Sequence, residues 1–185
     1  MPGRRRHVFP VVTAAFVIPV VILAASGIGD GRVASANSSD QTRIVAAPVT
    51  VPILLPGVGS ERGLQVKTIL AERAISARFP EIRNIGGVRP DSMKWHPEGL
   101  AIDVVIPDYR TPAGKALGDR IMAFAFQNAD RFGLVNVIWQ QTYYPIGGKA
   151  HRMADLGSDD ANHYTHVHIA TNGGGYPNGS ETYAD

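Results

Sequence analysis

The chain has 185 residues, of which 44% are hydrophobic and 18% are charged. This composition is typical of a globular protein and excludes a fully disordered chain, and the length suits one domain with appendages. The sequence contains no cysteine. Disulfide bonds and thiolate metal sites are therefore excluded, and any metal would be held by His, Asp or Glu side chains.

Residues 1–36 have the pattern of an export signal. An arginine triplet, Arg4–Arg6, precedes the apolar run Val8–Ala25, and Ala34-Ser35-Ala36 has the small residues of a signal peptidase site. We expect a signal peptide here. The alternative is an uncleaved membrane anchor, because about 20 apolar residues can cross a bilayer. Both alternatives place the rest of the chain outside the cytoplasmic membrane, secreted or in the cell envelope.

Without residues 1–36, the charge of the chain changes sign. Four of the 18 Lys and Arg residues and one of the 16 Asp and Glu residues lie in that segment, which leaves 14 basic and 15 acidic residues. The remainder therefore has a net charge of about −1, although the whole chain has a pI of about 9.0. We expect no basic surface for nucleic acid.

The rest of the chain is expected to form a linker, one domain and a tail. Residues 37–62 are polar at first and then rich in Val, Pro and Gly, which is typical of a linker. Residues 63–175 contain the periodic apolar segments of a folded domain. Residues 176–185 belong to a stretch rich in Gly, Asn and Ser and are expected to form a flexible tail.

Predicted helices and strands are interspersed along residues 63–175. Apolar spacing predicts helices over residues 64–79 and 113–132, the first ended by Pro80 and the second by Gly133. Apolar and β-branched runs predict strands at residues 84–89, 100–106, 135–144 and 164–170. This order predicts an α+β domain, with a small antiparallel or mixed sheet and flanking helices.

Three histidines crowd into the segment His163-Tyr164-Thr165-His166-Val167-His168. Residues i and i+2 of a strand point to one face, so His166 and His168 project together, and His163 joins them only if the chain is still turning there. Two imidazoles beside apolar neighbours need a polar partner, and histidine is the commonest metal ligand. The alternatives are hydrogen-bonded or surface histidines, or adventitious metal binding.

A second motif is His96-Pro97-Glu98-Gly99-Leu100-Ala101-Ile102-Asp103. Asp103 is the single carboxylate of an apolar run, and a buried carboxylate needs a cation or hydrogen bonds. Gly99 permits a sharp bend that can bring His96 beside Asp103. Two histidines and one aspartate, with a fourth position open for water, make a catalytic zinc site. The alternative is that Asp103 caps a turn.

Together the two motifs resemble the LAS metallopeptidases, the group of lysostaphin, the D-Ala-D-Ala metallopeptidases and the hedgehog fold. His96, Gly99, Ala101 and Asp103 are similar to the first zinc motif of the D-Ala-D-Ala enzymes. The His-x-x-His-x-His triple resembles the penicillin-insensitive murein endopeptidases. The likeness is closest to an actinobacterial extracellular domain with HPxGxAxD and HxxHVH motifs.

The resemblance implies a hedgehog- or DD-peptidase-like fold and a zinc-dependent hydrolase that cleaves a peptide bond of peptidoglycan, as a carboxypeptidase or an endopeptidase. The implied roles are Zn²⁺ ligands for His96, Asp103 and His168, catalysis for His166, and substrate binding or orientation of the site for His163 and Arg89. D-Ala-D-Ala carboxypeptidases usually have Glu three residues before the last ligand, where this chain has Thr165. Catalysis would therefore depend on His166. The alternative is a non-catalytic, zinc-containing module that binds the cell wall or a partner.

Overall fold

The computed structural model of the chain describes residues 51–185. The signal or anchor expected at residues 1–36 lies outside the described residues, and the predicted linker is described only from residue 51 onward. Among residues 51–185, no helix is long and apolar enough to span a bilayer.

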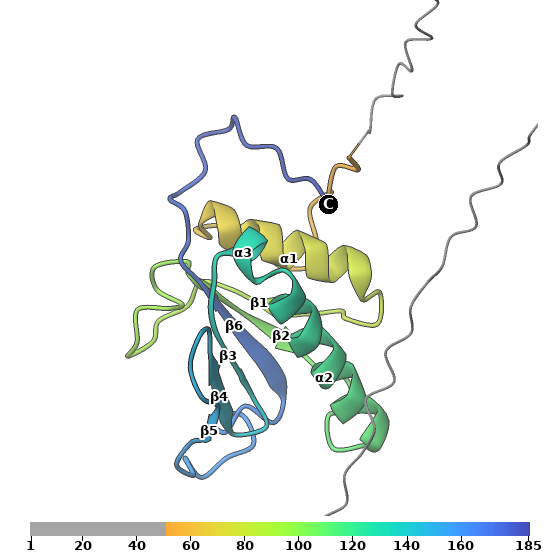
Figure 1. Cartoon of the computed structure of the whole chain (residues 1–185), viewed down its shortest axis with the longest axis vertical. Coiled ribbons are helices and arrows are strands. Elements are labelled where there is room, and N and C mark those ends of the chain that lie inside the picture. Colours follow the sequence, from red (N-terminus) through yellow and green to blue (C-terminus); the bar gives the residue numbers. More distant parts are fainter. Residues whose placement is uncertain (1–50) are drawn as a thin grey trace, which may run out of the picture. The chain divides into compact units, whose positions relative to one another are not determined.

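Within residues 51–185, six strands form one sheet in the order β1-β2-β6-β3-β4-β5 (Figure 1). All neighbouring strands are antiparallel, so the prediction of an α+β fold with a small antiparallel sheet is confirmed. The strands are β1 (Ile85–Gly86), β2 (Ala101–Val105), β3 (Leu134–Trp139), β4 (Thr142–Pro145), β5 (His151–Arg152) and β6 (His166–Thr171).

Three helices accompany the sheet, namely α1 (Val66–Arg78), α2 (Pro112–Gln127) and α3 (Ala129–Phe132). They pack against one sheet face, where alternate residues of the central strands are apolar and buried in the core. The core residues of the two strands nearest the site are Ile102, Val104, Val167 and Ile169. Trp139 also lies in this core, and its Nε1 donates a hydrogen bond to Asp119 at 3.0 Å.

The single helix predicted over residues 113–132 is in fact two helices, separated at Asn128. The carbonyl oxygen of Phe124 accepts both the backbone N–H of Asn128 at 3.1 Å and its side-chain Nδ2 at 2.9 Å, and Asn128 itself leaves the helical conformation with a φ of −105° and a ψ of 22°. Helix α2 begins at Thr111, whose hydroxyl accepts a hydrogen bond from Gly114 N at 3.1 Å. Helix α3 ends at Gly133 in the left-handed conformation, as the sequence predicted.

The single strand predicted over residues 135–144 is also wrong, because this segment contains most of the hairpin of β3 and β4. The chain reverses at Gln140 and Gln141, which have φ angles of 51° and 58°. Two consecutive left-handed residues match the twist of a two-residue hairpin loop, but such loops usually contain Asn or Gly. The Gln-Gln pair therefore gave no signal of a turn.

Residues at both ends of the described chain pack on α1, which extends the folded unit beyond residues 63–175. Leu54 is buried and its backbone N–H donates to Tyr183 O at 2.8 Å. Arg73 of α1 forms an ion pair with Glu61 at 2.6 Å and lies over the Tyr183 ring at 4.2 Å. The described part of the linker and the end of the tail are thus held by specific contacts.

Candidate metal centre

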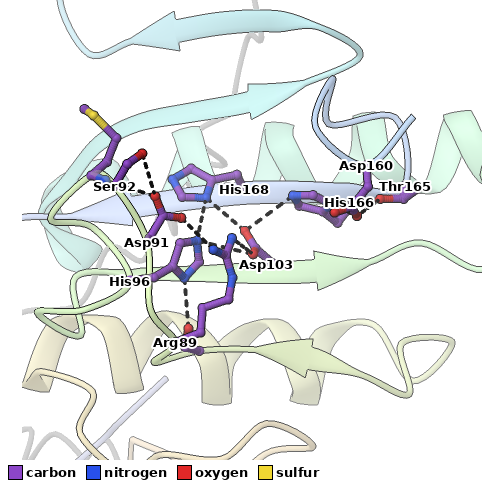
Figure 2. Close-up of polar contacts among 11 residues, drawn as sticks. Arg89, Asp91, Ser92, His96, Asp103, Asp160, Thr165, His166 and His168 are labelled. Carbon is purple, nitrogen blue, oxygen red and sulfur yellow. Dashed lines mark hydrogen bonds and ion pairs between the residues drawn. The ribbon is translucent and has the colours of Figure 1, made fainter. Parts of the chain in front are cut away.

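The second face of the sheet carries the residues that the sequence analysis singled out. Asp103 of β2 pairs directly with His168 of β6, and His168 pairs on its other side with Ile138 of β3. Directly opposite residues of antiparallel strands lie on the same face, with Cβ atoms about 5 Å apart. His166, two residues before His168, therefore shares this face, which Figure 2 shows in close-up.

His96 reaches the same place from the loop between β1 and β2 (Figure 2). The loop turns back at Gly99, which has a φ of 67° and whose N–H bonds to His96 O at 3.1 Å. A Cβ atom at Gly99 would overlap the carbonyl oxygen of Gly63, so this position requires glycine for two reasons. The predicted bend that brings His96 beside Asp103 is confirmed.

We call His96, Asp103 and His168 the His/Asp site. All three side chains are buried, and one ligand atom from each lies within 4.8 Å of the others. His168 Nδ1 is 2.9 Å from Asp103 Oδ1, and His96 Nε2 is 3.2 Å from both His168 Nδ1 and Asp103 Oδ2. Ligands at zinc–nitrogen distances of 2.0–2.1 Å in a tetrahedron are about 3.3 Å apart. The His/Asp site can therefore hold a metal ion with little rearrangement.

Hydrogen bonds orient the two imidazoles of the His/Asp site. His96 Nδ1 lies 2.9 Å from the carbonyl oxygen of Gly87, which can only accept, so Nδ1 donates and Nε2 keeps its lone pair. In the metal-free protein, His168 Nδ1 donates to Asp103 and faces the lone pair of His96. A metal that binds His168 Nδ1 would displace this proton.

Asp103 is held as a carboxylate. Burial raises its pKa, but the hydrogen bond from His168 and the electrostatic effect of the neighbouring imidazoles of His96 and His166 outweigh this and hold the pKa well below its usual range. Arg89 Nη2 donates to Asp103 Oδ2 at 2.9 Å, and Arg89 Nη1 donates to Asp91 at 2.5 Å. Arg89 therefore orients the Asp103 carboxylate, although the Arg89 side chain is about half exposed.

His166 is buried beside the His/Asp site, with one ring nitrogen engaged and one free. Its Nδ1 lies 2.9 Å from the Thr165 hydroxyl and 3.6 Å from Asp160 Oδ1. Its Nε2 is 3.5 Å from Asp103 Oδ1 and has no hydrogen-bond partner among the described residues. Burial lowers the pKa of His166, while Asp103 and Asp160 partly oppose this effect. An imidazole that is neutral at neutral pH can accept a proton at the free Nε2.

His163 lies in the turn before β6 with a φ of 55°, so the condition set by the sequence analysis for joining the other histidines is met. Its ring centroid is 4.9 Å from that of His166 and 5.6 Å from that of His168. Burial, followed by the electrostatic effect of the neighbouring imidazoles of His166 and His168, lowers the pKa of His163 to about 4. His163 is therefore a neutral neighbour that packs against both imidazoles.

A cavity of about 980 Å³ opens beside the His/Asp site, and we call it the site cavity. Arg89, His163 and His166 line it together with the three residues of the His/Asp site. Its apolar wall comes from Met93, Trp95, Ile138, Tyr143, Met153 and Leu156. The sequence did not predict this wall. Its one signal was the alternation of residues along the strand, which places Ile138 on the face opposite the core. Trp139, the next residue along β3, lies in the core on the opposite face of the sheet.

The fold and the site define an α+β protein with a buried two-histidine, one-aspartate site that can hold a metal ion. The family described as VldE, C-terminal domain, matches residues 60–164, and the chain belongs to this family. The match covers the whole of the first motif, His96 to Asp103, but it ends at Tyr164, before the strand that carries His166 and His168. No curated protein matches the chain, and no solved structure matches it.

Proposed function

We propose that this chain is an exported, zinc-dependent hydrolase that cleaves a peptide bond of peptidoglycan, as a carboxypeptidase or an endopeptidase. One observation carries the proposal: three buried ligand atoms, all within 4.8 Å of one another, lie beside a large cavity that also contains His166, whose Nε2 is free. The export pattern of residues 1–36 and the resemblance to LAS metallopeptidases supply the substrate class.

The donor set favours zinc. Two imidazoles and one carboxylate suit Zn²⁺, and catalytic zinc sites commonly have three protein ligands and a fourth position for water or substrate. Bound zinc would supply a Lewis acid and lower the pKa of a coordinated water to about 7. The chain fixes the ligands beforehand through Gly87 O, which orients His96, and Arg89, which orients Asp103.

His166 is the proton-transfer residue in this proposal. Its free Nε2 would take the proton of the attacking water and return it to the leaving amine. Thr165 and Asp160 hold the opposite nitrogen, Nδ1, and so fix the ring orientation. His163 and Arg89 remain candidates for substrate contact, since both line the site cavity. In this chain His166 would do the work that a glutamate does in many peptidases of the resembling group.

Zinc-loaded protein, incubated with cross-linked and uncross-linked muropeptides, tests the proposal. We expect products that lack one peptide bond, and we expect His166→Ala to abolish turnover while retaining about one zinc per chain. Wild-type protein that binds zinc but cleaves none of these substrates would contradict the hydrolase and favour the non-catalytic zinc module. Wild-type protein without stoichiometric zinc would contradict both.

A further inference from the structure

Asn136 of β3 is buried, but the polar atoms of its side chain form no hydrogen bonds with the described residues. The residue is 1% exposed, and neither Oδ1 nor Nδ2 has a hydrogen-bond partner among the described residues. Leaving a buried donor or acceptor unpaired costs roughly 1–3 kcal/mol, so such a group calls for an explanation. Asn136 lines the site cavity, which suggests that its partner is a ligand of that cavity.

The sheet register places Asn136 close to the His/Asp site. Asn136 pairs with Ala170 of β6 on one side and with Pro145 of β4 on the other, so neither residue directly opposite it has a side chain that can form a hydrogen bond. His168 lies between His166 and Ala170 along β6. Asn136 and His166 therefore flank the His/Asp site from opposite sides.

The chemistry of the carboxamide indicates what it would bind. An Asn side chain offers one carbonyl acceptor and one NH₂ donor, which complement the N–H and C=O of a peptide group. The charged groups of the His/Asp site are already engaged with one another, whereas both polar atoms of Asn136 are free. A carboxamide shielded from bulk water also binds a peptide group more strongly than an exposed one.

We propose that Asn136 is a substrate-positioning residue whose carboxamide hydrogen-bonds a peptide group next to the scissile bond. This rests on the proposed peptidase function. The two amide atoms are shielded from bulk water, so the substrate must shift a neighbouring part of the cavity wall to reach them. In the free protein the two polar atoms of Asn136 are unpaired, and the bound substrate would give them hydrogen bonds. Substrate binding is therefore favoured more by Asn136 than by an apolar side chain of similar size at this position.

Asn136→Leu in the full-length chain tests the proposal, with Asn162→Leu as the matched control. Asn162 is also buried, but its side chain accepts from Leu156 N at 2.8 Å and donates to Asp155 at 2.7 Å. We expect Asn136→Leu to keep one zinc per chain and an equal or higher Tm, and to lower kcat/KM for peptide cleavage about tenfold or more. Asn162→Leu is expected to lower the Tm. A similar loss of Tm in Asn136→Leu would reveal a structural role, as for a bridging water, and would overturn the proposal.

A substrate series in which each amide N–H is replaced in turn by an ester oxygen locates the contact. At one position we expect the ester to lower kcat/KM with wild-type protein and to have little further effect with Asn136→Leu. Equal ester effects in both proteins at every position would overturn the role of Asn136. If wild-type protein cleaves peptides and Asn136→Leu cleaves them equally well, only this inference fails. If wild-type protein cleaves none, the proposed function fails and this inference fails with it.

Discussion

His168 is the central residue of the His/Asp site, since its Nδ1 approaches both Asp103 and His96. We expect His168→Ala to lower bound zinc from about one per chain to well below one, because two protein ligands bind zinc far more weakly than three. Metal analysis of the purified protein after dialysis measures this. His151→Ala is the control, because His151 is exposed on the edge strand β5. Full zinc content in His168→Ala would contradict the assignment.

Glu72 of α1 predicts a pH dependence of stability that is separate from the metal centre. Its carboxylate accepts hydrogen bonds from Gly59 N at 2.7 Å and Ser76 Oγ at 3.0 Å, but burial dominates and raises its pKa above 4.5. The folded state therefore favours the protonated form, and stability is lost as the pH rises from about 4.5 through the folded-state pKa.

Glu72→Gln should remove this dependence. We expect the free energy of unfolding of wild-type protein, relative to Glu72→Gln, to increase as the pH falls from 7 towards 4.5. Urea unfolding of both proteins in the presence of a chelator, at several pH values, measures the difference. A difference that is constant with pH would show that the pKa of Glu72 is the same in the folded and unfolded states, and one that grows as the pH rises would show that folding lowers this pKa; either result would contradict the prediction.

At the scale of single residues, the sequence was informative where chemistry imposes a spacing. The interval from His96 to Asp103 needs a glycine bend, and the alternation of His166 and His168 needs a strand, so both could be read from residue order. Asn136 could not be found in this way. A single Asn in a strand belongs to no sequence motif. Asn136 stands out only because the folded structure leaves its two polar side-chain atoms without hydrogen-bond partners.

At the scale of elements, the loop that carries His96 depends on Gly99. Gly99→Ala combines an unfavourable φ of 67° with an overlap of the new Cβ and the Gly63 carbonyl. We expect a loss of about 2–4 kcal/mol in stability and weaker zinc binding, because His96 is displaced. Gly147→Ala is the control: φ is 70° there, but no atom lies within 4 Å of the added Cβ. Urea unfolding should show the larger loss for Gly99→Ala, and equal losses would argue against the overlap.

Helices and strands with a clear apolar period were located by the sequence, as α1 and β2 illustrate. The errors occurred at single residues whose backbone conformation does not follow the periodicity of the apolar residues around them. Asn128 leaves the helical conformation between α2 and α3, and Gln140 begins a left-handed turn without the usual Asn or Gly. The antiparallel order of six strands depends on contacts between distant segments, which periodicity does not encode.

At the scale of the whole molecule, the two ends of the described chain stabilise α1 together. Tyr183 is 8% exposed, lies under Arg73 and bonds to the backbone of Leu54. We expect Tyr183→Ala to lower the free energy of unfolding by roughly 2–4 kcal/mol, near the range for aromatic residues removed from a core. Tyr176→Ala is the control, because Tyr176 is 60% exposed. A Tyr183→Ala effect as small as that of Tyr176→Ala would indicate a mobile tail.

The position of β6 has a consequence for the order of assembly. Although β6 is the last strand in the chain, it lies between β2 and β3, and it carries both His166 and His168 (Figure 1). A chain that emerges from its N-terminus, from a ribosome or through a membrane pore, therefore holds two separate half-sheets until its final residues appear. Neither half-sheet contains a complete set of ligands. For a chain exported unfolded, the metal would be acquired only at the destination, from whatever supply that compartment offers.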